Sequence, residues 1–139
     1  MIKKITAENF KHYGRVIEYA GKPKSGRHSL FRIIMREPRE SGWRIAYLLV
    51  RDKAIRRLEQ HLHTYESFEP VKGRALLYLS ATKDLRKIEC FLLDKPVVLY
   101  KGIWHGVVTL GRESEIKITE NARVRSSYWS VGTVLGGRR

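Results

Sequence analysis

The stretch QHLHTYESFEPVKG, residues 60–73, brings three potential metal ligands close together. His61 and His63 are two positions apart, so on an extended strand both imidazoles would point to the same face. Glu66 follows three residues later, where the chain begins to turn. Two imidazoles on one strand face, with a carboxylate at the strand's end, are half of a metal site. His105 is the best candidate for the other half.

Short strand-like segments surround this stretch on both sides. Residues 54–62 lead directly into the histidine pair, and Ala75–Ser80 is apolar throughout and rich in β-formers, which predicts a buried strand. Residues 6–14 predict a short helix capped by Thr6, and residues 21–26 predict a loop from their Gly, Pro and Ser content. Further strands are expected over residues 15–19, 30–36, 43–50, 87–93, 97–100, 106–110, 115–119 and 125–134. About ten short segments with turn signals between them indicate an all-β sandwich or barrel.

Length and composition indicate one globular domain. The chain has 139 residues, with 42% hydrophobic and 10% aromatic residues, which suits a packed core rather than disorder. No apolar run approaches the roughly 20 residues that a membrane span needs, and no apolar segment follows the first lysines to form a secretory signal. The single cysteine, Cys90, excludes an internal disulfide and reads as a buried core thiol. We therefore expect a cytoplasmic protein that does not enter a membrane.

The net charge is strongly positive. Lys and Arg number 28 against 14 Asp and Glu, a formal charge of +14, which invites a nucleic-acid interpretation. The basic residues are nevertheless spread through the chain and mixed with acidic ones; the densest places are residues 22–27, 51–57 and 138–139. No zinc-finger spacing, recognition-helix pattern or RNA-binding aromatic motif occurs. A solvated, highly charged surface is favoured, and a basic field that attracts a small anionic substrate is compatible with it.

The metal-ligand candidates also resemble a known pair of motifs. His61-x-His63-x2-Glu66-x6-Gly73 has the layout of the first cupin motif, and residues 100–105 (YKGIWH) resemble the second, with Tyr100 in place of the usual proline. The resemblance implies one cupin domain over residues 1–139: a double-stranded β-helix, or jelly-roll barrel, with a short N-terminal helix. It also implies a homodimer, because cupins commonly pair through edge strands. By that pattern the metal ligands would be His61, His63, Glu66 and His105.

A narrower resemblance is to the ureidoglycolate lyases, also called ureidoglycolate hydrolases, which are small cupins. Residues 5–17 (ITAENFKHYGRVI) follow that family's opening segment, residues 59–70 its central segment, and residues 99–105 its later corner. The resemblance implies cleavage of ureidoglycolate to glyoxylate and urea, a reaction of allantoin degradation. Two departures concern the substrate: Glu66 stands where the family usually has Gln, and His105-Gly106 replaces a common His-His-Pro run.

The donor set implied by the resemblance suits Mn, Fe, Ni, Co or Zn, and the sequence does not choose among these metals. The elimination would need a base for the substrate hydroxyl proton and an acid for the departing nitrogen. The candidate catalytic residues are Glu66, Tyr100 and Lys101, and the candidate substrate-binding residues are Arg44, Tyr65 and Trp104. Two alternatives to a lyase stay open: a non-catalytic cupin that binds a small ligand, and, less favoured, a β-barrel that binds nucleic acid.

Overall fold

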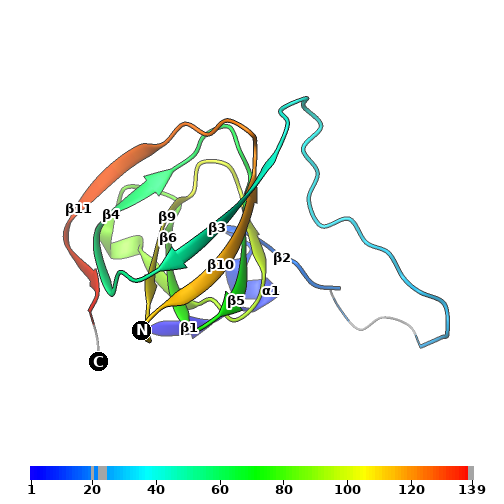
Figure 1. Ribbon diagram of the computed structural model, residues 1–139, viewed down its shortest axis with the longest axis horizontal. Coiled ribbons are helices and arrows are strands. Elements are labelled where there is room, and N and C mark those ends of the chain that lie inside the picture. The colour runs from blue at the N-terminus through cyan, green and yellow to red at the C-terminus, as the bar shows by residue number, and fades with distance from the viewer. Residues whose placement is uncertain (20, 22–24, 138–139) are drawn as a thin grey trace.

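Two β-sheets pack face to face in the computed structural model (Figure 1), which describes residues 1–19, 21 and 25–137. Parts of the predicted loop 21–26 and of the basic stretches 22–27 and 138–139 lie outside the described residues. The elements in chain order are β1 Ile2–Lys4, α1 Ala7–Phe10, β2 Gly14–Val16, β3 Arg44–Val50, β4 Ala54–Gln60, β5 Glu66–Lys72, β6 Ala75–Ser80, a 3₁₀ turn Leu85–Lys87, β7 Glu89–Leu92, β8 Val97–Leu99, β9 Trp104–Thr109, β10 Ser114–Glu120 and β11 Ser127–Gly136.

The strand order is that of a jelly roll. The first sheet, called sheet A, has the order β1-β7-β6-β9-β4-β11, and the second, called sheet B, has the order β2-β8-β5-β10-β3. Strands β3 to β10 form its eight-stranded centre, in which every neighbouring pair is antiparallel. This arrangement confirms the predicted double-stranded β-helix. The apolar side chains of both inner faces meet in one large core, which includes Phe68, Leu77, Phe91 and Ile116.

The predicted N-terminal helix is confirmed over a single turn. The backbone N–H of Asn9 donates to Thr6 Oγ1 at 3.1 Å, and the N–H of Thr6 donates to Asn9 Oδ1 at 2.9 Å. These reciprocal bonds form a capping box that satisfies backbone groups at the start of the helix. Phe10, fully buried at the helix end, packs edge-to-face on Phe91 with ring centroids 5.4 Å apart. The helix is thereby fixed to the core.

Strand β5 was not expected, because Pro70 and Gly73 indicated a turn that began after Glu66. The structure instead begins a strand at Glu66 and carries it to Lys72. A proline is unfavourable inside a sheet because it lacks a backbone N–H. Here β8 pairs only with Glu66–Phe68, and the pairing of β5 with β10 shifts register beside Pro70. The proline therefore lies where the ladder is already interrupted. Gly73 closes the turn, with φ of +77° that favours glycine.

The prediction of a strand over residues 30–36 is wrong: the structure assigns no strand to this segment. Residues 25–43, which we call the arm, instead run outside the barrel between β2 and β3 (Figure 1). The β-rich sequence of the arm has no neighbouring strand in the described part of the chain, and strand propensity alone does not create a ladder.

Among the described residues, no helix is long and apolar enough to cross a membrane.

Candidate metal centre

Two facing rows of polar side chains lie inside the otherwise apolar barrel. In sheet A, Glu59 of β4 stands directly opposite His105 of β9. In sheet B, Glu120 of β10 stands between Glu66 of β5 and Arg44 of β3. Residues paired directly across strands lie on the same face of a sheet, so each row extends over neighbouring strands.

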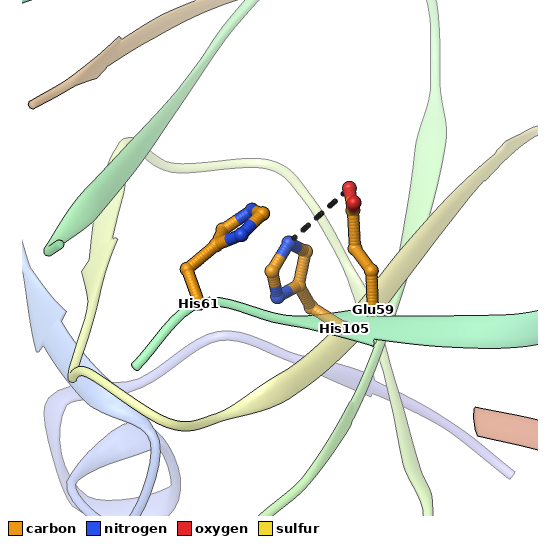
Figure 2. A group of neighbouring side chains, drawn as sticks. All are labelled: Glu59, His61 and His105. Carbon is orange, nitrogen blue, oxygen red and sulfur yellow. Dashed lines mark ion pairs between the residues drawn. The ribbon is translucent and has the colours of Figure 1, made fainter. Parts of the chain in front are cut away.

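His61 joins the two rows from the loop between β4 and β5. Figure 2 shows the side chains of Glu59, His61 and His105 pointing toward one another. Glu66 Oε1 lies 3.2 Å from His61 Nε2 and 3.1 Å from His105 Nε2, while Glu59 Oε1 lies 3.7 Å from His105 Nε2. The side chains of His61, Glu66 and His105 are all less than a tenth exposed.

Backbone carbonyls fix which nitrogen of each imidazole faces the centre. His61 Nδ1 lies 3.2 Å from the carbonyl oxygen of Arg125, and His105 Nδ1 lies 3.0 Å from that of Ile103. A carbonyl oxygen only accepts hydrogen bonds, so each Nδ1–H donates to its carbonyl. In the neutral imidazole this leaves a lone pair on Nε2 directed at Glu66. The same orientation is typical of histidines that bind metals.

The centre has too many acceptors unless a proton or a cation lies among them. Glu66 Oε1 and His105 Nε2 are both buried, and neither makes a hydrogen bond of acceptable geometry. Burial alone would raise the pKa of Glu66, but the neighbouring imidazoles of His105 and His61 outweigh burial and lower the pKa to about 2. Burial opposes protonation of His105 as well, yet Glu59 and Glu66 raise its pKa to about 10.

The donor set fits a divalent transition metal. Two ligand atoms that each lie about 2.1 Å from one tetrahedral or octahedral ion are about 3.0 to 3.4 Å apart. The distances from Glu66 Oε1 to the two Nε2 atoms, 3.1 and 3.2 Å, fall in this range. Imidazole and carboxylate together suit Mn, Fe, Ni, Co or Zn. A cation at this point would also satisfy the two buried atoms that lack hydrogen bonds.

The structure does not bring His63 to this centre. Strand β4 ends at Gln60, so His61 and His63 lie in a loop, and the prediction that they share one face of a strand is wrong. His63 is exposed, and its backbone carbonyl accepts a hydrogen bond from the Asn121 side chain. Glu59, which the sequence did not single out, points into the barrel. The period-two rule could have found Glu59, because it lies two positions before His61.

Glu120 was also missed by the sequence analysis. Strand β10 alternates strictly between buried and half-buried residues, and Glu120 occupies a buried position in line with Ile116 and Ile118. Glu120 could have been found from the sequence, because it is a carboxylate at an inward-facing position of a strand with alternating burial. Arg44 holds Glu120 Oε2 with Nη2 at 2.7 Å and Nε at 3.0 Å, while Glu120 Oε1 is buried without a hydrogen bond. The substrate-binding candidate Arg44 is thus engaged in an ion pair at the centre.

The remaining candidates lie at different distances from the centre. Tyr100 lines a small hollow beside His61, Glu66 and His105. Lys101 pairs with Glu37 of the arm at 2.6 Å and lies over the Tyr65 ring, 4.8 Å from its centroid. Neither Lys101 nor Tyr65 is therefore joined to the centre by a contact.

Trp104 faces away from the centre, because it precedes His105 on strand β9 and neighbouring strand residues point to opposite faces. It packs against Trp129, with ring centroids 5.9 Å apart, in a second hydrophobic cluster with Leu58 and Val131. The structure thus gives Trp104 a packing environment rather than a place beside the cluster of ionisable groups.

Two larger hollows also reach the centre. One, of about 220 Å³, is lined by Glu59, Glu66 and His105 together with apolar residues, among them Phe68 and Ile118. The other, of about 620 Å³, lies along β4 and β9. These two strands pair at one position, where Glu59 is opposite His105. Its lining includes Glu59, His105 and the cations Arg56 and Arg57. The hollows leave room for a small molecule next to the centre.

Comparisons with known proteins add little to this geometry. No protein-family profile matches the chain, and no curated protein matches its sequence. Among solved structures, a single-residue mutant of Bacillus subtilis oxalate decarboxylase is similar, with a TM-score of 0.49 and 18% identity. The match covers 66% of this chain and 24% of the oxalate decarboxylase chain. This chain therefore spans about a quarter of that neighbour, and the fold rests on its own strand order.

We expect the metal-free protein to be most stable between about pH 4.5 and pH 6.5. Glu66 has a lowered pKa in the folded state, so its stabilising contribution is present above its ordinary value of 4.5 and is lost as the pH falls toward 2. His105 has a raised pKa, so its contribution is complete below 6.5 and is lost as the pH rises toward 10. Urea denaturation across this range, after chelation, measures the effect. A free energy of unfolding that rises from pH 6.5 to pH 9 would contradict it.

Proposed function

We propose that this protein is a metal-dependent cupin enzyme of the ureidoglycolate lyase type, acting on a small anionic hydroxy acid that carries a ureido group. The observation that carries the proposal is that Glu66 Oε1 lies 3.2 Å from His61 Nε2 and 3.1 Å from His105 Nε2. All three side chains are buried, and Glu66 and His105 line a hollow. Such donors suit a metal that keeps open positions for a substrate.

His61, Glu66 and His105 would hold the metal. When bound, a divalent ion would polarise the substrate and lower the pKa of its hydroxyl group. The carbonyls of Arg125 and Ile103 orient the imidazoles by accepting their Nδ1–H protons, which keeps both Nε2 atoms free to bind. Arg56 and Arg57, on the lining of the larger hollow, supply positive charge for a substrate carboxylate.

Glu59 is the residue best placed to move a proton. It lines both hollows, and its carboxylate lies 3.7 Å from His105 Nε2 and within 4.8 Å of a ring nitrogen of His61. In the proposed elimination Glu59 accepts the hydroxyl proton as the carbonyl of glyoxylate forms. The C–N bond breaks, its electron pair stays on the urea nitrogen, and Glu59 returns the proton to that nitrogen. One carboxylate thereby serves as base and then as acid.

The proposal is tested with protein purified without an affinity tag. We expect mass spectrometry to find one equivalent of a divalent transition metal, and ureidoglycolate to yield equal amounts of glyoxylate and urea. Glu59→Gln should keep the metal but lower kcat by about 10² to 10³. Glu69→Gln, which alters a half-buried carboxylate paired with Lys117, should leave kcat unchanged. Full metal loading without glyoxylate release would instead favour a non-catalytic, ligand-binding cupin.

A further inference from the structure

Two strand-length segments lack a ladder partner in the described part of the chain. Residues 30–36 (LFRIIMR) are rich in β-formers, yet no described strand pairs with them. Strand β3, the seven residues Arg44–Val50, is the edge of sheet B and pairs with β10 alone. Unpaired backbone N–H and C=O groups in a row are a template for pairing with another strand. The two segments have the same length.

The arm touches the outside of its own barrel but adds no strand to either sheet. Figure 1 shows it running clear of the two sheets before it enters β3. A hollow of about 410 Å³ lies between the arm and sheet B, lined by Phe31, Ile33 and Trp43 from the arm side and by Val98 and Thr119 from the sheet.

An ion pair fixes the arm where it nears the barrel. Glu37 contacts Lys101 at 2.6 Å, and the side chain of Glu37 is largely buried. This contact ties the arm to Lys101, in the turn between β8 and β9. Residues 30–36 carry no assigned strand, and the edge of β3 stays unpaired in the described chain.

Exposed apolar side chains accumulate on both segments and at Trp43, which directly precedes β3. Phe31 is 88% exposed and Trp43 70%, and Leu30, Ile33, Ile45, Tyr47 and Leu49 are all at least 41% exposed. Taking about 150 to 250 Å² for each complete aromatic side chain, Phe31, Trp43 and Tyr47 alone expose roughly 300 to 550 Å², to which the four aliphatic side chains add. A stable protein–protein interface covers about 800 Å² on each partner. The exposed surface is therefore of the right size for one specific interface.

We propose that the arm binds a second copy of this chain. Residues 30–36 of each copy add as a strand to the free edge of β3 in the other copy, which extends both B sheets by one strand. A two-fold axis makes the exchange reciprocal, so each copy gives one arm and receives one. A second copy is the occupant because one chain carries both the unpaired strand and an unpaired edge of equal length. This proposal is independent of the metal centre.

The net charge of +14 on each copy opposes association. Salt screens this repulsion over about 8 to 10 Å at physiological ionic strength, so the dimer should tighten as salt is raised from 20 to 200 mM. A pairing driven by opposite charges would weaken instead.

The first test measures mass in solution by light scattering and sedimentation. We expect twice the 16.2 kDa mass of the chain. Ile33→Pro and Ile34→Pro are made separately, because neighbouring N–H groups of a strand point to opposite sides and one of them must face the partner. At least one should weaken dimerisation tenfold or more, while the control Ser25→Pro, in the same arm, should not. A monomeric protein at 100 µM, or a dimer that neither substitution weakens, overturns the proposal.

The second test maps the contact. In a Cys90→Ser background, chains with Ile33→Cys, the centre of residues 30–36, are mixed with chains with Tyr47→Cys, the centre of β3, and oxidised. We expect a disulfide between the two kinds of chain, because the arm of one lies on β3 of the other. Leu85→Cys, an exposed position on the 3₁₀ turn, replaces Tyr47→Cys in the control. Equal cross-linking in the control overturns the proposed contact. Metal content, measured in every variant, reports separately on the proposed function.

Discussion

His105→Gln is expected to weaken metal binding by at least about 100-fold, whereas His63→Gln should leave it unchanged. His105 is buried, its Nε2 lies 3.1 Å from Glu66 Oε1, and its Nδ1 is oriented by a backbone carbonyl. Glutamine has similar volume but lacks the imidazole nitrogen, and losing even an outer-shell partner typically costs 10- to 100-fold in metal affinity. His63 is exposed in the loop after β4. Titration calorimetry with Mn²⁺ and Zn²⁺ measures both variants.

The pair of variants separates two ligand sets. The cupin resemblance places His63 among the ligands, while the structure places His61, Glu66 and His105 together. If His63→Gln lost the metal as completely as His105→Gln, the loop between β4 and β5 would have to rearrange on binding, and the ligand set proposed here would be wrong. Circular dichroism of the metal-free variants serves as the control for folding.

Arg44→Met is expected to lower the free energy of unfolding at pH 7.5 by about 2 kcal/mol. Removing one partner of a buried ion pair costs about 3 to 5 kcal/mol. The expected loss for Arg44→Met is smaller because the Arg44 side chain is half-exposed. Without Arg44, buried Glu120 stands beside Glu66 with no cation on its other side. Arg51→Met is the matched control: its pair with Glu113 is exposed, so we expect a cost of about 0.5 kcal/mol or less. Urea denaturation measures both variants.

The loss in the free energy of unfolding caused by Arg44→Met should also depend on pH. Burial, followed by the charge of Glu66, raises the pKa of Glu120 even in the presence of Arg44. A carboxyl group whose pKa is raised in the folded state destabilises the fold as the pH rises above its ordinary value of 4.5. The difference between Arg44→Met and the unmodified protein should therefore shrink as the pH is lowered from 7.5 to 5. A constant difference over this range would show that Glu120 carries no unpaired charge in the variant.

Most of the barrel could be predicted from sequence because its strands alternate or are continuously apolar. Ala75–Ser80 was predicted with the bounds that β6 has in the structure, and β3 and β10 to within one residue at either end. Strand β5 could not be predicted, because a proline is tolerated there only through the local register shift. The prediction of a strand over residues 30–36 was wrong for the opposite reason. The β-propensity of these residues is high, but no strand in the described chain pairs with them.

The sequence by itself determined that the protein is an all-β barrel and that His61, Glu66 and His105 are candidate ligands. Only the tertiary structure decided that Glu59 and Glu120 join these residues and that His63 does not. The physical reason is the crossing between the two sheets. After Gln60 the chain must leave sheet A and begin β5 in sheet B at Glu66, so the strand geometry that would have placed His61 and His63 on one face ends before either residue. The crossing turns His61 inward and leaves His63 outside, while pairing across the strands brings in carboxylates from distant parts of the chain.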